Sequence, residues 1–152
     1  MDYAYGKGKL IFAAAGTSFS WTSWWGVIYP AAYSSCLAVT GVKENGNKCS
    51  SCHDGSAVMY TITMERTANS NRNSLSLPAS GVTSTYIGGS SCATAAASGI
   101  ASLVWSARPN MTRAQVVTSL TNTSQFYPSK NSSKGYGNLN AGAAVNYAVT
   151  NY

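Results

Sequence analysis

The sequence feature that most constrains this chain is a Gly-Gly-Ser-Ser sequence at 88–91 that leads directly into a run of small residues. Alanine has the highest helix propensity, so residues 93–105 are predicted to form a helix despite Gly99. Small side chains let neighbouring elements approach closely. The stretch therefore predicts a central helix that is buried against the rest of the fold.

Ser91 lies at the predicted N-terminus of this helix. Free backbone N–H groups and the positive end of the helix dipole favour a negative charge at such a position. The same field stabilises a developing oxyanion, so a serine there suits the role of nucleophile. We therefore predict Ser91 as the nucleophile, its own N–H as an oxyanion donor, and Gly88 and Gly89 as part of the substrate-binding surface.

Residues 89–99 read Gly-Ser-Ser-Cys-Ala-Thr-Ala-Ala-Ala-Ser-Gly. They resemble the Gly-Thr-Ser-x-Ala-x-Pro-x-x-Ala-Gly motif of the subtilisin-like serine proteases, or subtilases, which carries the nucleophile of that family. The resemblance places the family's nucleophile on Ser91. Ala95 stands where the family has proline.

Further motifs resemble the same family in the same order. Gly-Lys-Leu-Ile-Phe-Ala-Ala-Ala-Gly at 8–16 resembles the strand that precedes the family's oxyanion-hole asparagine, and Thr17 stands in the place of that asparagine. Tyr-Pro-Ala-Ala-Tyr at 29–33 resembles a family turn. Residues 135–145 resemble the family's Gly-Tyr-Gly-x-x-Asn-Ala-x-x-Ala-Val. The resemblance runs from Lys7 to about Ala148 and implies that Thr17 is the second oxyanion donor.

The expected fold is a three-layer α/β domain with a mainly parallel sheet, subtilisin-like but truncated, formed by residues 1–152 as a single domain. Short apolar runs predict buried strands at 10–16, 36–42 and 57–64. The Asp and His motifs of the family do not occur in the sequence, so the chain looks like the C-terminal half of such a domain. It is expected to self-associate, or to pair with the missing N-terminal half, along an exposed sheet edge.

A serine nucleophile needs a base, and the base needs an orienting acid. The chain has one histidine, so a triad within the chain must use His53, with Asp54 or Glu65 as the orienting acid. We predict His53 and Asp54 as catalytic residues. The alternative is that His53 is a surface loop residue without a catalytic role.

Cys49-Ser50-Ser51-Cys52-His53 also matches the Cys-x-x-Cys-His signature of c-type haem attachment. A zinc site with Cys36 or Cys92 as a further ligand is a second possibility. The third is disulfide bonding among the four cysteines, and the fourth is that some stay free thiols. We expect at least one disulfide, no haem or other cofactor, and no metal.

Composition excludes other classes of function. Charged residues make up 9% of the chain, against roughly 25% in an average soluble domain. The net charge is +6, but the basic residues are scattered, which does not favour nucleic-acid binding. No apolar run approaches the ~20 residues of a membrane span. No signal peptide is recognisable at Met1, so the chain is expected to be either part of a longer secreted precursor or cytoplasmic if it is the whole product.

Trp24 and Trp25 belong to a tryptophan-rich loop that either packs as a plug or forms part of the substrate-binding rim. Our leading hypothesis is a serine hydrolase, a peptidase or an esterase, that acts on peptide or ester substrates through Ser91. The alternative is a catalytically inactive module derived from a subtilase, with a binding or structural role.

Overall fold

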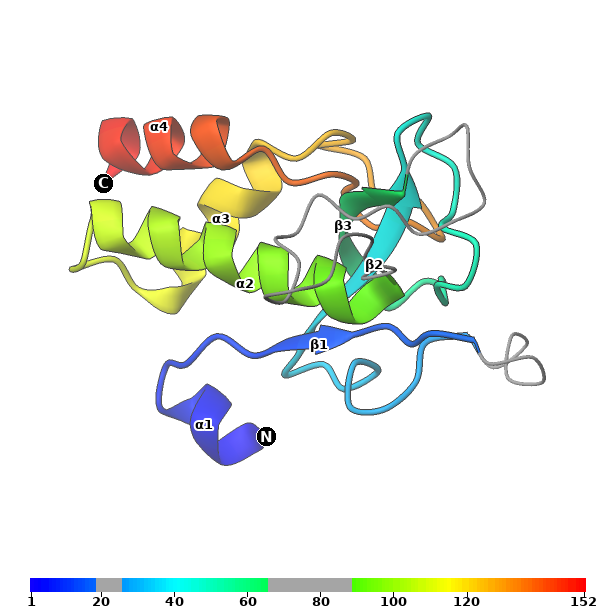
Figure 1. Ribbon diagram of the computed structural model, residues 1–152. Coiled ribbons are helices and arrows are strands. Elements are labelled where there is room, and N and C mark those ends of the chain that lie inside the picture. The colour runs from blue at the N-terminus through cyan, green and yellow to red at the C-terminus, as the bar shows by residue number, and fades with distance from the viewer. Residues whose placement is uncertain (19–25, 66–88) are drawn as a thin grey trace, which may run out of the picture.

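The computed structural model describes residues 1–18, 26–65 and 89–152 (Figure 1). In chain order, the elements are α1 (Asp2–Gly6), β1 (Phe12–Ala14), β2 (Leu37–Lys43), β3 (Val58–Glu65), α2 (Gly89–Ala107), α3 (Arg113–Asn122) and α4 (Ala141–Asn151).

The strands form a parallel three-stranded sheet in the order β1-β2-β3. Ala13 lies opposite Ala38, and Val39 lies opposite Tyr60. Continuous apolar runs are typical of strands that are covered on both faces, and β2 is buried at five successive positions. The three predicted strands, the parallel sheet and the α/β class are confirmed.

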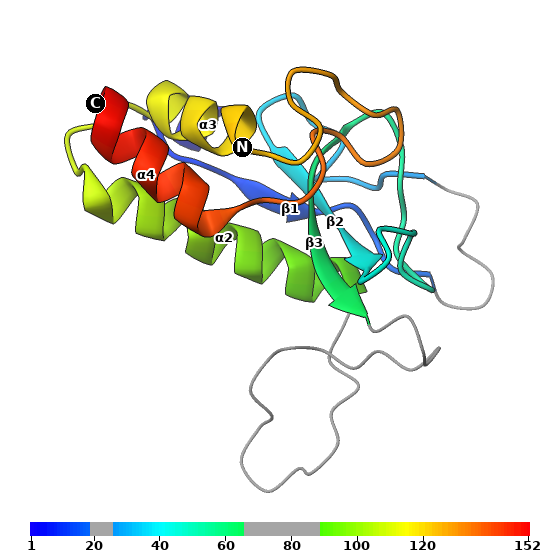
Figure 2. The same ribbon diagram turned by 90° about the horizontal axis from the view of Figure 1, so that it is seen from above.

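The alanines of α2 let this helix lie close to the sheet. Ala93 and Ala97 are fully buried against Val39 of β2 and Met64 of β3. Farther along the helix, Val104 joins the larger core that α3 and α4 complete. In Figure 1, α2 lies between β1 and α4, and Figure 2 shows α2, α3 and α4 side by side.

Loop segments, not helices, cover the second face of the sheet in the part of the chain that the structure describes. Ala13 and Ala38 pack there against Ala31 and Cys36. The predicted turn at 29–33 is present and contains a cis peptide bond before Pro30.

Local signals explain where the C-terminal helices begin. Thr112 and Gln115 form a capping box at the start of α3. Asn140 caps α4 by accepting a hydrogen bond from the Ala143 N–H at 3.0 Å.

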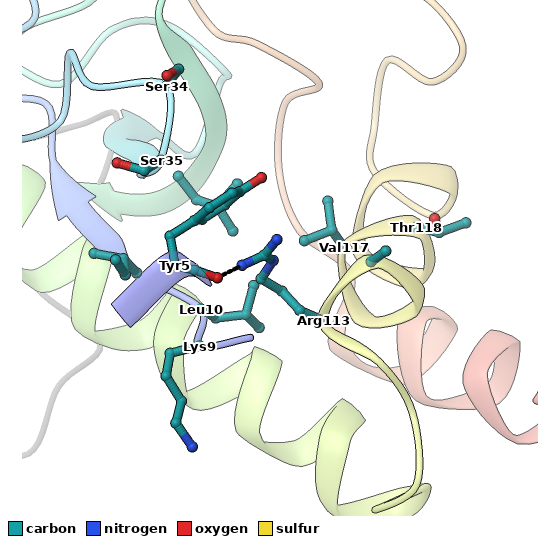
Figure 3. Close-up of a pocket in the computed structure, with 11 residues that line it drawn as sticks. Tyr5, Lys9, Leu10, Ser34, Ser35, Arg113, Val117 and Thr118 are labelled. Carbon is teal, nitrogen blue, oxygen red and sulfur yellow. Dashed lines mark hydrogen bonds between the residues drawn. The ribbon is translucent and has the colours of Figure 1, made fainter. Parts of the chain in front are cut away.

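Helix α1 was not predicted, because residues 1–9 show no apolar period. It is held against α3 by Arg113, whose guanidinium lies 3.5 Å from the centroid of the Tyr5 ring. Arg113 also donates a hydrogen bond to the Tyr5 carbonyl (Figure 3).

Tyr60 is the largest fully buried side chain in the described part of the chain. Its hydroxyl lies 2.7 Å from Thr121 Oγ1, which joins β3 to α3. Burial raises the pKa of the Tyr60 phenol from 10.0 to about 12, although the Thr121 hydrogen bond opposes this shift.

This shift predicts a loss of stability in alkali. Below pH 10, Tyr60 is neutral in both the folded and the unfolded state. Between pH 10 and about 12 the unfolded chain releases this proton while the folded chain keeps it, so the free energy of unfolding falls, by up to roughly 3 kcal/mol. Urea unfolding at several pH values measures this slope. Tyr60→Phe should make the slope shallower, and an unchanged slope would contradict the assignment to Tyr60.

Candidate active site

The C-terminal end of β1 meets the N-terminus of α2, two elements that are distant in the sequence. The Gly16 N–H donates a hydrogen bond to Ser90 Oγ at 3.2 Å, and Thr17 Oγ1 lies 3.0 Å from Ser90 Oγ. Gly89 has a φ of +80°, and a Cβ at this position would lie 2.9 Å from Thr17 Oγ1. A glycine is therefore needed for α2 to begin this close to Thr17.

Ser91 follows in the first turn of α2 and is exposed. Helix N–H groups in the first turn have no acceptor within the helix, and no acidic side chain in that turn competes for them. Thr17 and Ser91, which were predicted as oxyanion donors, thus lie on two elements that contact each other. The arrangement offers an accessible hydroxyl beside groups that can donate hydrogen bonds to an anion.

The segment 49–53 contacts the residues that follow β1. Thr17 pairs with Cys52 in an isolated antiparallel bridge. The Ser18 N–H donates to the Ser51 carbonyl at 2.6 Å, and the His53 N–H donates to the Gly16 carbonyl at 2.8 Å. Backbone contacts therefore fix the direction in which the chain leaves β1.

A disulfide between Cys49 and Cys52 closes this segment, which confirms the expectation of at least one disulfide. Both cysteines are buried, and their sulfurs pack against Gly41 of β2. Cys36 and Cys92 are free thiols. The disulfide occupies both sulfurs that the haem and zinc interpretations require. The described residues contain no cluster of three or more His, Cys, Asp or Glu side chains able to hold a metal.

His53 is buried, and its ring packs against Gly16. Neither ring nitrogen has a hydrogen-bond partner among the described residues. Asp54 pairs instead with Lys48, whose Nζ lies 3.2 Å from Asp54 Oδ1. The hydrogen bonds of a Ser91–His53–Asp54 triad are thus not formed in this structure, and the catalytic roles of His53 and Asp54 stay predictions.

Glu65, the alternative orienting acid, contacts Ser50. Its buried carboxylate accepts hydrogen bonds from the Ser50 N–H, at 3.0 and 3.1 Å, and from Ser50 Oγ at 3.0 Å. Glu65 thereby anchors the disulfide-closed segment to the end of β3. Trp24, Trp25 and Gly88, which were predicted as substrate-binding residues, lie outside the described residues.

A pocket of about 340 Å³ lies at the other end of β1, between α1 and α3. Tyr5 and Arg113 contribute to its lining, and Figure 3 shows that Lys9 extends away from them. None of the predicted site residues in the described part of the chain lines this pocket. No helix within the described ranges is long and apolar enough to cross a bilayer.

Comparison with known proteins shows the family to which this chain belongs. Residues 1–138 match the subtilase family. The chain is therefore a member of the subtilase family of serine peptidases, as its motifs predicted.

Individual relatives are proteases. A thermostable alkaline protease of Halalkalibacterium halodurans is 32% identical over 95% of this chain, which spans 37% of that protein. The structure of the MycP3 protease from a type VII (ESX-3) secretion system is 27% identical, with a TM-score of 0.69 over 93% of this chain and 45% of that one.

The structure of a protease of Pseudoalteromonas arctica has a TM-score of 0.73 at 24% identity, over 97% of this chain and 45% of that one. At this level of identity, the similarity supports the fold alone. The chain thus spans less than half the length of these relatives.

Proposed function

We propose that this chain carries the nucleophile and the oxyanion-binding side of a serine hydrolase site. Ser91 is the nucleophile, and the Ser91 N–H and the Thr17 hydroxyl are the oxyanion donors. The single observation that carries the proposal is the exposure of Ser91 in the first turn of α2, directly after the residues that contact Thr17.

In the proposed reaction, Ser91 Oγ attacks the acyl carbon of a peptide or ester and passes its proton to a base. The carbonyl oxygen becomes an oxyanion that accepts hydrogen bonds from the two donors. When the tetrahedral intermediate collapses, the base returns the proton to the leaving group. Water then hydrolyses the acyl-enzyme by the same two steps, with water as the nucleophile and Ser91 Oγ as the leaving group.

The proposed reaction needs a base that accepts the proton of Ser91. His53 is the base available within the chain, but its ring nitrogens have no hydrogen-bond partner among the described residues. The relatives are more than twice as long as the stretch that aligns, so a base can also come from a polypeptide that pairs with this one. We propose such pairing, or self-association, along the outer edge of β1, since β1 pairs with only one of the described strands.

The buried disulfide and the low charge content support an extracellular location for the chain as part of a longer protein. The proposed substrates are peptides and activated esters. Esters with good leaving groups are expected to react more readily, because they need less help from a general acid.

Hydrolysis of a p-nitrophenyl ester tests the proposal. Ser91→Ala should reduce the rate of the purified chain to that of the buffer. If His53 is the base, His53→Ala should reduce the rate to a similar degree, because a nucleophile and its base act as one unit. Ser106→Ala is the matched control, since Ser106 is an exposed serine at the far end of the same helix, and it should leave the rate unchanged.

The rate of the Ser91→Ala variant distinguishes the hydrolase from the inactive module. A Ser91→Ala variant that is as fast as the parent would contradict the hydrolase proposal. The chain would then fit the inactive module, the alternative favoured by the His53 ring, which has no hydrogen-bond partner within the described ranges.

A further inference from the structure

Ser90 is a second serine at this site, and sequence reasoning assigned it no role. It is fully buried, with an exposed fraction of 0%, whereas its neighbour Ser91 is exposed. Its hydroxyl contacts two groups at the end of β1, the Gly16 N–H at 3.2 Å and Thr17 Oγ1 at 3.0 Å. A buried hydroxyl that joins these elements fixes the surroundings of Thr17.

The direction of the two hydrogen bonds follows from the chemistry of the donors. A backbone N–H can only donate, so Ser90 Oγ is the acceptor for Gly16. Thr17 Oγ1 is the only acceptor for the Ser90 proton among the described residues. If Thr17 donated to Ser90 instead, the buried Ser90 proton would have no acceptor among the described residues, which is unfavourable. Ser90 therefore donates to Thr17.

This direction leaves the Thr17 proton without an acceptor among the residues that the structure describes. Thr17 is half-buried, and the contact between its hydroxyl and Ser90 lies at the boundary of the core. We propose that Ser90 is a positioning residue, which accepts a hydrogen bond from Gly16, donates one to Thr17, and so directs the Thr17 proton to the oxyanion. The inference rests on the proposed function and deepens it. A threonine hydroxyl rotates freely unless a neighbour orients it, and a hydrogen bond that it accepts strengthens the one that it donates.

The test measures kcat and KM for a p-nitrophenyl ester in three variants of the full chain. Thr17→Val removes the donor while keeping the side-chain shape, and kcat should fall on the order of 100-fold. Ser90→Ala should lower kcat about tenfold with little change in KM. Ser90→Thr keeps the hydroxyl and should keep kcat near that of the parent.

The double variant distinguishes positioning from an independent effect. Because Ser90 acts through Thr17, Ser90→Ala in the Thr17→Val background should cause little further loss of kcat. If the two substitutions lower kcat by factors that multiply in the double variant, the positioning role is overturned. It is also overturned if Ser90→Ala has the kcat of the parent. Ser106→Ala on the same helix is the control for serine removal, and thermal melting of each variant shows whether it is folded.

Failure of this inference and failure of the proposed function give different results. If the ester activity depends on Ser91 but Ser90→Ala leaves kcat intact, only the positioning role is overturned. If Ser91→Ala is as active as the parent, both proposals are overturned. Amide hydrogen exchange adds a readout without turnover, because Ser90→Ala should speed exchange at Gly16 whereas Thr17→Val should not.

Discussion

Replacing Gly16 with alanine is expected to lower the free energy of unfolding by about 2 to 5 kcal/mol. Gly16 has a φ of +125°, which a residue with a Cβ rarely adopts, and the new Cβ would lie 2.9 Å from His53 Cγ. The His53 ring is buried, so it has little space to move away. Urea unfolding of the purified variant measures the loss.

Two further variants separate backbone strain from the steric clash. Gly99→Ala adds a Cβ in the middle of α2, where no described residue outside the adjacent helix backbone lies within 4 Å of it, and it should stabilise the chain by about 0.5 to 1 kcal/mol. His53→Ala in the Gly16→Ala background should recover the steric part of the loss. If Gly16→Ala is as stable as the parent, the close packing between Gly16 and His53 is wrong.

Removing the disulfide by Cys49→Ser and Cys52→Ser is expected to cost about 2 kcal/mol from the entropy of the short loop alone. Two buried sulfurs would also be replaced by hydroxyls that need hydrogen-bond partners, which adds to the cost. The backbone hydrogen bonds of Ser18 and His53 depend on this segment, so their amide protons should exchange faster. Thermal melting and hydrogen exchange measure the two effects.

A reductant provides the matching control for the disulfide. It should lower the melting temperature of the parent and leave that of the double serine variant unchanged. Cys92→Ala removes a free thiol and should have a much smaller effect. A parent whose melting temperature is the same with and without reductant would contradict a stabilising disulfide.

The fold was predictable from the sequence where one local signal dominated. The apolar runs at 36–42 and 57–64 lie within one residue of β2 and β3, because a buried parallel strand must be apolar on both faces. The alanine run predicted α2, although the helix begins four residues earlier, at Gly89. Helix α1 was missed because its five residues are held by Arg113, a contact between distant parts of the chain.

The candidate site was predictable only in part, because distant contacts decide its hydrogen bonds. From its place in the first turn of a helix, the motif predicted Ser91 as the nucleophile. It did not identify Ser90, whose partners lie more than 70 residues earlier in the chain. The contact between Glu65 and Ser50 was not predicted either, since it depends on where β3 ends. Cysteine spacing also left several pairings open, and the structure forms the one between Cys49 and Cys52.

A chain of contacts runs from the segment 49–53 to the start of α2. The disulfide and Glu65 fix the segment 49–53, and that segment holds the chain where it leaves β1. Gly16 and Thr17 in turn contact Ser90, the residue that precedes the proposed nucleophile Ser91. The proposed function therefore depends on the reactivity of one exposed hydroxyl.

Labelling with a fluorophosphonate probe, followed by intact mass and peptide mapping, tests that reactivity most directly. The probe forms a covalent bond with an activated serine and needs no particular peptide sequence. The expected result is a single adduct on Ser91, which Ser91→Ala abolishes and Ser106→Ala leaves unchanged. A parent chain without an adduct, or an adduct that persists in Ser91→Ala, would contradict Ser91 as the nucleophile.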